Sequence, residues 1–255
     1  GNLRRRREKN CNREEMNSEV EQEYWVYQIK GTPYQVIQLP ENATDFPHPF
    51  IIPDENRSPD GLYAIGGNLN PGFVLSAYSQ GALPWTAVEN LKYGIDWYCP
   101  LDRFVIFPDE IHISHSMKSL LNKHIYTVTK DKDFDAVIKK CSECNSRNKQ
   151  DGAWLGKEII NTFTRLNLLG YAHSYEVWNK EGELVGGLYG LEINNCFLGE
   201  SMFSIEPSGS KIALIHMCQQ EKKYKFIDCQ FETPHLKSMG GRHIDIDEYL
   251  EMMYG

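Results

Sequence analysis

The chain has 255 residues, of which 41% are hydrophobic and 24% charged, and its formal net charge is −8. The length suits one domain or two small ones, and the composition is typical of a soluble globular protein. The acidic charge excludes a general nucleic-acid coat protein, so contact with nucleic acid must be local or confined to one end of it. No apolar run is long enough to cross a bilayer, and we expect no membrane partner.

The cysteines predict the compartment. There are seven, an odd number, and several fall inside apolar strand or helix patterns. This favours reduced, buried thiols in the cytoplasm over a disulfide framework. Cys141 and Cys144 form the one closely spaced pair, and a tetrahedral zinc site would need a second pair. We therefore predict no metal site.

Three regions follow one another along the chain. Residues 1–45 are predicted to be a polar, partly disordered N-terminal extension, because charges of both signs dominate its first part. Residues 46–102 are rich in proline, glycine and aromatic residues, which predicts dense turns and a small irregular N-terminal domain. Its one expected helix spans Pro71 to Ser79, with a proline in the first turn.

Residues 103–255 alternate helices and strands. Helical spacing predicts helices over 130–144, 155–169 and 210–222, the second of them closed by Gly170. Strand patterns cover 173–178, 183–193, 196–204 and 225–230, and the first three are joined by short polar links typical of hairpins. This order predicts an α+β fold, with an acetyltransferase-like second domain whose sheet is mixed and largely antiparallel.

Polar residues interrupt two strands that should be buried. Glu200 and Met202 share one face of the strand 196–204, and Asp228 and Gln230 share a face of the later strand. Buried carboxylates and amides are costly unless they are hydrogen-bonded, so these strands predict a polar pocket sunk into the sheet. The apolar residues beside it are otherwise ordinary core positions: Leu188, Phe197, Met202, Leu214 and Ile227.

Several long motifs occur in a fixed order. They are Phe46-Pro47, 60–69, Ala77-Tyr78, 81–85, 97–100, 173–178, 184–190, 199–204, Ser210-Lys211 and 227–230. Together they resemble the leucyl/phenylalanyl-tRNA–protein transferase family, from about residue 46 to about residue 241. The segments 199–204 and 227–230, which carry the polar residues Glu200, Asp228 and Gln230, are part of this resemblance.

The resemblance implies an aminoacyltransferase. Such an enzyme moves Leu or Phe, and less well Met, from aminoacyl-tRNA to the N-terminal Arg or Lys of an acceptor protein. The new peptide bond creates a destabilising N-terminus for N-degron proteolysis. No cofactor, metal or ATP is required, because the aminoacyl ester is already activated.

The resemblance also implies roles for particular residues. Asp228 and Gln230 are the catalytic pair, with Gln230 contacting the reacting amine or aminoacyl group, and Glu200 hydrogen-bonds the aminoacyl end. The side-chain pocket is formed by the five apolar residues named above, while Trp85 and Trp154 make a wall for the terminal adenosine. Candidates for a local tRNA patch are Lys118, Lys123, Lys130, Lys132, Lys139 and Lys140.

Two other functions are open. The first is a different acyltransferase of the same fold, using coenzyme A or a cell-wall peptide, although the usual coenzyme A loop is not visible. The second is a non-catalytic module that binds tRNA or N-degrons. The joint presence of Glu200, Asp228 and Gln230 argues against it, because a binding module would not need the three together.

Overall fold

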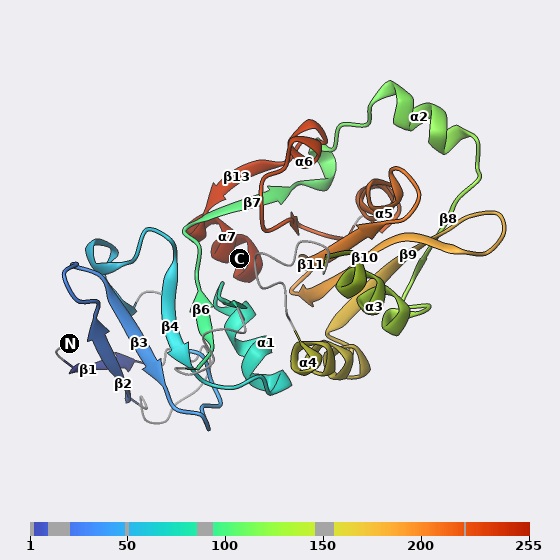
Figure 1. Ribbon diagram of the computed structural model, residues 1–255. Coiled ribbons are helices and arrows are strands. Elements are labelled where there is room, and N and C mark those ends of the chain that lie inside the picture. Colours follow the sequence, from blue (N-terminus) through green and yellow to red (C-terminus); the bar gives the residue numbers. More distant parts are fainter. Residues whose placement is uncertain (1–2, 10–20, 49–50, 86–93, 146–155, 222) are drawn as a thin grey trace. The chain divides into compact units, whose positions relative to one another are not determined.

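The structure is a computed structural model that describes residues 3–9, 21–48, 51–85, 94–145, 156–221 and 223–255 (Figure 1). The chain divides into two compact units, Gly1–Leu101 and Asp102–Gly255. Within the ranges described, no helix combines the length and the hydropathy needed to cross a membrane.

The first unit is built on a six-stranded sheet with the order β1-β2-β3-β4-β6-β5. Its elements are β1 (Leu3–Lys9), β2 (Glu21–Gln28), β3 (Gln35–Leu39), η2 (Asp54–Asn56), β4 (Leu62–Gly66), α1 (Pro71–Ser79), β5 (Leu83–Trp85) and β6 (Asp96–Tyr98). The predicted helix over Pro71 to Ser79 is thereby confirmed. Its core centres on the fully buried Trp97, whose ring lies 5.2 Å from Phe73 and 5.4 Å from Phe46 between centroids.

The structure differs from the predicted polar extension over 1–45. Strands β2 and β3 pair antiparallel, and β3 continues the sheet through a parallel pairing with β4. Tyr24, Val26 and Ile37 are buried. Tyr24 and Val26 are two residues apart in β2, as one buried face of a sheet requires, but the glutamates that precede them are typical of a polar segment.

The second unit is built on a seven-stranded sheet with the order β13-β7-β12-β11-β10-β9-β8. The strands are β7 (Asp102–Ile106), β8 (Thr127–Lys130), β9 (Ala172–Trp178), β10 (Leu184–Ile193), β11 (Cys196–Ser204), β12 (Ile227–Asp228) and β13 (Arg242–Asp245). All neighbouring pairs are antiparallel except β11 and β12. The predicted mixed, largely antiparallel α+β architecture is confirmed.

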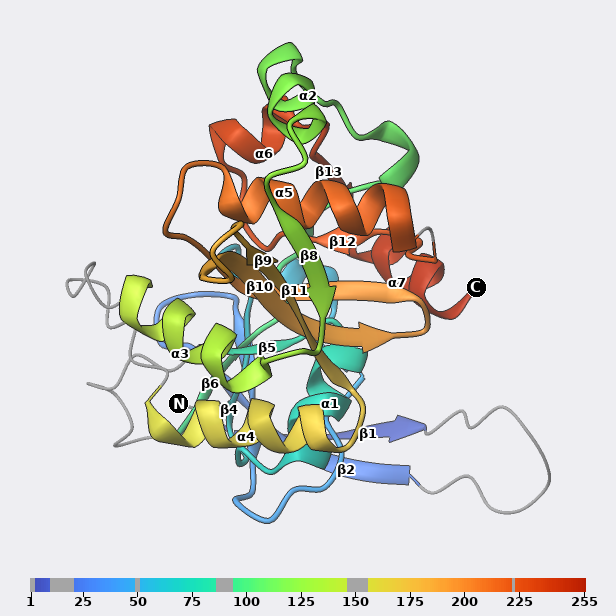
Figure 2. The same cartoon turned by 90° about the vertical axis from the view of Figure 1, so that its right-hand side faces the viewer.

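Helices cover both faces of this second sheet (Figures 1 and 2). The helices described in this unit are η4 (Pro108–Glu110), α2 (His115–Asn122), α3 (Phe134–Asn145), α4 (Lys157–Leu168), α5 (Gly209–His216), the π-helical turn η6 (Met217–Glu221), α6 (Pro234–Ser238) and α7 (Ile246–Tyr254). Helix α5 packs on one face, where Leu188 belongs to its core. Helices α3 and α4 pack on the other, where Phe134 and Phe163 lie edge-on to Tyr189.

Several elements differ from the predicted ones in ways that matter for the site. The predicted helix over 130–144 begins only at Phe134, because Thr127–Lys130 pairs with β9 as an edge strand. The predicted strand over 225–230 is only two residues long, Ile227–Asp228. Strands β7 and β13 were not predicted, since each is short and carries charged residues.

Two glycines let α5 approach the sheet closely. A Cβ added at Gly186 would lie 2.6 Å from the backbone of Gly209, and one added at Gly209 would lie 2.7 Å from the carbonyl oxygen of Val185. Real Cβ atoms do not approach backbone so closely. The glycines within strand β10 thus serve the close approach of another backbone, as their position in a strand pattern predicts.

Replacing Gly186 with alanine should therefore destabilise the second unit. We expect Gly186→Ala to cost about 1–3 kcal/mol in the free energy of unfolding, the usual range for overpacking. Urea unfolding measures it. Gly72→Ala is the matched control, because a Cβ there meets nothing within 4 Å and the residue lies in α1. Equal unfolding midpoints for Gly186→Ala and wild type would contradict the close approach.

Candidate active site

A cavity of about 620 Å³ opens in the second unit where β11 and β12 part. The two strands are in register only at Phe197 with Ile227 and at Leu198 with Asp228. Beyond this point β11 continues to Ser204, while the backbone N–H of Cys229 donates to the carbonyl oxygen of Phe104 in β7 at 2.9 Å. The chain after β12 thus follows β7 away from β11, and the gap between them forms the cavity.

The cavity brings together eight of the residues singled out in the sequence. Its lining comprises Leu188, Phe197, Gly199, Glu200, Ser201, Met202, Leu214, Ile227, Asp228, Cys229, Gln230, Phe231, Thr233 and Leu236. Trp85 lies on β5 of the first unit and is 45% exposed. Trp154 lies outside the described residues.

Glu200 sits at an irregularity in β11. Gly190 pairs with Gly199 and Tyr189 pairs with Ser201, so Glu200 is an extra residue with no partner in β10. Such a bulge bends the strand and re-aims the side chain. This explains how a carboxylate in the middle of a long strand comes to line the cavity.

Gln230 occupies a tight turn directly after β12. Its φ is +63°, which is uncommon for a residue other than glycine. The N–H of Phe231 donates to the carbonyl oxygen of Cys229 at 2.8 Å, which makes Gln230 the central residue of a γ-turn with positive φ, a rare and strained conformation. Such a conformation persists only where the contacts around the residue hold it.

The side-chain amide of Gln230 reaches across the gap to β11. Its Nε2 donates to Oε2 of Glu200 at 3.2 Å. A carboxylate can only accept, so the amide must face Glu200 through its nitrogen. The amide oxygen Oε1 then remains as an acceptor, and no described residue donates to it. A molecule in the cavity that carries an N–H group can use it.

Asp228 contacts Gln230 through its backbone N–H and not through its side-chain amide. Its side chain is 3% exposed, and Oδ1 accepts the backbone N–H of Gln230 at 2.8 Å. Its Oδ2 accepts from Nη2 of Arg103 at 3.2 Å and from the hydroxyl of Tyr249 at 2.7 Å. Both oxygens are thus engaged inside the protein, and the carboxylate fixes the turn that carries Gln230.

Sequence reasoning missed Arg103 and Tyr249. Arg103 is 4% exposed at the start of β7, and Tyr249 is fully buried on α7. Two signals could have found them. Arg103 directly precedes the apolar run Phe104–Ile106, and Tyr249 lies on the same helical face as Ile246 and Met253. A buried arginine needs a carboxylate partner, and Asp228 is the buried aspartate.

The floor of the cavity is apolar. Phe197, Leu214, Ile227 and Leu188 are at most 2% exposed, and Met202 is partly exposed beside them. Burial raises the pKa of the Cys229 thiol at the cavity wall, with a further contribution from Asp228, so the thiol stays protonated. It is therefore a poor nucleophile. No cluster of metal-ligating side chains occurs within the ranges that the structure describes.

This arrangement can bind an apolar side chain and orient the polar group next to it. It offers an acceptor at Gln230, a carboxylate at Glu200 and a dry floor, but no activated nucleophile among the described lining residues. Such a site suits a reaction between two substrates that are held in register, rather than one through a covalent enzyme intermediate.

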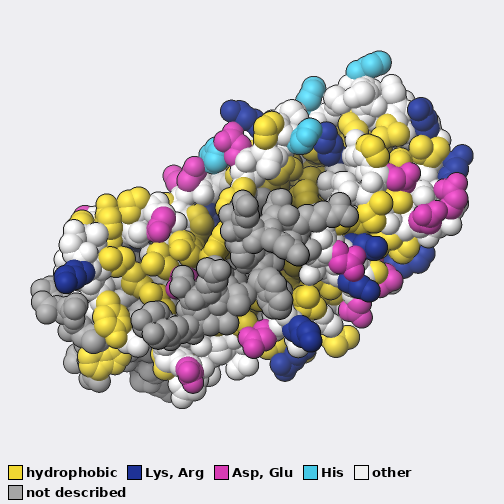
Figure 3. All heavy atoms as spheres, viewed as in Figure 1, with side chains coloured by type: hydrophobic (Ala, Val, Ile, Leu, Met, Phe, Trp, Pro, Cys, Tyr) yellow, Lys and Arg dark blue, Asp and Glu magenta, His cyan; other side chains and the backbone are white. Residues whose placement is uncertain are grey.

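The lysines proposed for a tRNA patch do not form a uniform group. On the face shown in Figure 3, Lys and Arg side chains of the second unit are interspersed with Asp and Glu. Lys130 is bound to Glu192 at 2.7 Å, and the ammonium of Lys132 lies 4.8 Å from the ring centre of Trp178. Both are thus engaged within the protein.

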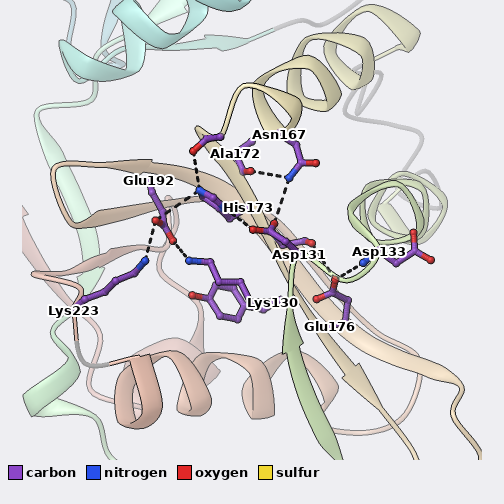
Figure 4. A network of polar contacts seen from close by, with 12 residues as sticks. Lys130, Asp131, Asp133, Asn167, Ala172, His173, Glu176, Glu192 and Lys223 are labelled. Carbon is purple, nitrogen blue, oxygen red and sulfur yellow. Dashed lines mark hydrogen bonds and ion pairs between the residues drawn. The ribbon is translucent and has the colours of Figure 1, made fainter.

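Lys130 belongs to a polar network on β8, β9 and β10 (Figure 4). Glu192 lies at its centre and accepts from Lys130, from Lys223 at 3.1 Å and from the hydroxyl of Tyr224. His173 lies between Asp131, at 2.5 Å, and Glu192, at 3.7 Å. Burial raises the pKa of Glu192, but the hydrogen bonds from Lys130 and Tyr224 and the charges of His173 and Lys130 outweigh it and lower the pKa to about 2.

Comparisons with known proteins agree on one family. The family profile described as leucyl/phenylalanyl-tRNA protein transferase matches residues 105–254. A protein of that name from Maridesulfovibrio salexigens is 40% identical over 82% of this chain and 84% of its own. Others are 45% identical in Syntrophus aciditrophicus, over 76% and 80%, and 42% identical in Legionella pneumophila strain Corby, over 80% and 90%.

Among solved structures, L-PGS from Bacillus licheniformis aligns with a TM-score of 0.41 and 13% identity. The alignment covers 91% of this chain and 77% of that one. This likeness is too weak to define a common fold.

The lowered pKa of Glu192 predicts a pH-dependent contribution to stability. Since the folded pKa is about 2 and the ordinary value is 4.5, the contribution is present above pH 4.5 and is lost as the pH falls towards 2. The difference in unfolding free energy between wild type and Glu192→Gln should therefore shrink from pH 7 to pH 3. Urea titrations measure it, with the exposed Glu181→Gln as control. A constant difference would count against the network.

The buried pair of Asp228 and Arg103 predicts a large effect of removing one partner. Asp228→Ala leaves the guanidinium uncompensated and should cost about 3–5 kcal/mol in unfolding free energy. Asp228→Asn should cost less, because its amide oxygen can still accept the N–H of Gln230. Urea unfolding compares them with the exposed Asp109→Ala. An Asp228→Ala protein as stable as wild type would contradict the pairing.

Proposed function

Because the chain belongs to the leucyl/phenylalanyl-tRNA protein transferase family and is therefore an aminoacyltransferase, we propose that it transfers Leu or Phe, and less well Met, from aminoacyl-tRNA to the N-terminal Arg or Lys of acceptor proteins. The observation that carries this proposal is the cavity between β11 and β12. It joins an apolar floor to the Gln230–Glu200 pair.

The apolar floor receives the donor side chain. Leu188, Phe197 and Leu214 offer the surface of a buried core, and the partly exposed Met202 can adapt to different shapes. Leu, Phe and Met lack branching at Cβ and can enter such a cavity. Val and Ile carry a branch next to the backbone and would clash at its mouth.

The transfer is an attack by the acceptor's α-amine nitrogen on the carbonyl carbon of the aminoacyl ester. A C–N bond forms, the C–O bond to the tRNA ribose breaks, the amine loses a proton and the ribose oxygen gains one. Gln230 accepts a hydrogen bond from the amine through Oε1. This contact directs the lone pair of the amine nitrogen at the carbonyl carbon of the ester. A neutral amide is a weak base, so its contribution is orientation rather than proton removal.

Glu200 and Asp228 have separate parts in this proposal. Glu200 holds the Gln230 amide through Nε2 and places a carboxylate beside the positively charged α-amine of the donor aminoacyl group. Asp228 acts through the backbone, because its oxygens bind Arg103, Tyr249 and the N–H of Gln230. It is a positioning residue rather than a base.

We place the activity in the cytoplasm, where aminoacyl-tRNA and reduced thiols occur together, and its product in N-degron proteolysis. Trp85 and Trp154 remain the proposed wall for the terminal adenosine, and the exposed Lys118, Lys123 and Lys139 remain the proposed phosphate contacts. Binding of tRNA through a few lysines should weaken as salt rises.

Transfer of radiolabelled Leu from Leu-tRNA to short peptides tests the proposal. Peptides beginning with Arg or Lys should be labelled, and those beginning with Asp or Ala should not. Gln230→Asn tolerates the left-handed turn but shortens the side chain, so its amide no longer reaches Glu200. We expect kcat to fall by about 10²-fold, as for a reacting group displaced by one bond length.

Gln220→Asn is the matched control, because it shortens an exposed glutamine on η6. Wild-type protein that binds Leu-tRNA but labels no peptide would contradict the proposal and favour a binding module. Labelling from acetyl-coenzyme A instead would favour an acyltransferase of the same fold that uses coenzyme A.

A further inference from the structure

Resting on the proposed function, we propose that Arg103 and Tyr249 are positioning residues for Gln230, which they reach through the carboxylate of Asp228 and the strained turn that follows it. They come from β7 and α7, at opposite ends of the second unit's sequence. Neither lines the cavity. Their effect on the reaction is therefore indirect.

The side chains of Arg103, Tyr249 and Asp228 all contact one another. Arg103 donates from Nη2 to Oδ2 of Asp228 at 3.2 Å, and the Tyr249 hydroxyl donates to the same oxygen at 2.7 Å. The guanidinium carbon of Arg103 also lies 4.3 Å from the ring centre of Tyr249. Because Arg103 and Tyr249 contact each other as well as Asp228, the carboxylate has little freedom to rotate.

The remaining oxygen of Asp228 sets the turn. Oδ1 accepts the N–H of Gln230 two residues on, which is an Asx-turn, and the N–H of Phe231 then closes a second turn on Cys229. A non-glycine residue at φ +63° persists only where its surroundings over-determine it. If Oδ2 were released, the carboxylate could rotate, Oδ1 could leave the Gln230 N–H, and the turn could relax.

Relaxation of the turn would move the reacting group. Gln230 spans the gap to β11 through the 3.2 Å hydrogen bond from Nε2 to Glu200. A change in its φ swings the amide away from Glu200 and from the amine it is to orient. The cavity floor is made by other residues, on β10, β11, β12 and α5, so donor binding should not change.

Tyr249 is the better residue to test. Burial, the charge of Asp228 and its hydrogen bond raise the pKa of Tyr249 far above the ordinary value, although Arg103 opposes this, so the hydroxyl is a donor at every working pH. Tyr249→Phe removes that donor and leaves the ring and the Arg103 charge in place. It is less disruptive than any change at Arg103, which would bury an unpaired carboxylate.

Steady-state transfer from Leu-tRNA to an Arg-initiated peptide tests the positioning role. For Tyr249→Phe we expect kcat to fall by about tenfold, the loss of one charge-assisted hydrogen bond, while KM for both substrates stays within about twofold. Hydrogen–deuterium exchange of the Gln230 backbone amide should become about tenfold faster. The rate should have the same pH profile as wild type, because no base has been removed.

Tyr224→Phe is the matched control. It also removes a buried tyrosine hydroxyl bonded to a carboxylate, here Glu192, on the far side of β11 from the turn. It should lower stability without changing kcat or exchange at Gln230. Equal kcat in Tyr249→Phe and wild type, or equal losses in both tyrosine variants, would overturn the proposal. If wild type transfers nothing, the proposed function fails, and exchange at Gln230 alone still decides whether Tyr249 holds the turn.

Discussion

The buried carboxylate of Asp228 is the constraint on which the site depends. At 3% exposure it must be compensated, and the compensation comes from Arg103, Tyr249 and the backbone N–H of Gln230. These partners link β7, β12 and α7. The same contacts that make the charge tolerable keep Gln230 in a conformation that few residues adopt unaided. The same contacts therefore compensate the charge of Asp228 and orient the amide of Gln230.

The cavity forms because β11 and β12 separate after Leu198 and Asp228. Gly199 permits the close approach of β12, since a Cβ there would lie 2.7 Å from the carbonyl oxygen of Asp228. One residue later the bulge at Glu200 re-aims β11, while Cys229 continues the pairing of β12 with β7. The strands thus meet at the base of the cavity and separate above it. The polar pair bridges the separation, and the apolar floor lies where the strands still touch.

The sequence predicted the second unit well and the first less well. Hairpins in β9, β10 and β11 followed from short polar links, and the strands carrying Glu200 and Asp228 were recognised by polar residues in apolar patterns. The strand β2 was missed because glutamates open it, and β3 because it is short, with two glutamines among its five residues. Local patterns could have marked Arg103 and Tyr249 as buried, but not their shared partner, since no local pattern shows which distant carboxylate a buried arginine contacts. For the same reason the direction of the Asp228 side chain, towards them and not towards the Gln230 amide, needed the structure.

The position at which an aminoacyl group binds tests the proposed active site most directly. It can be measured in a crystal structure with a non-hydrolysable phenylalanyl-adenosine amide. This compound mimics the end of the charged tRNA. We expect the phenyl ring on the floor formed by Phe197, Leu188 and Leu214, with the aminoacyl linkage beside Gln230 and Glu200. An analogue that inhibits transfer but binds away from the gap between β11 and β12 would contradict this expectation.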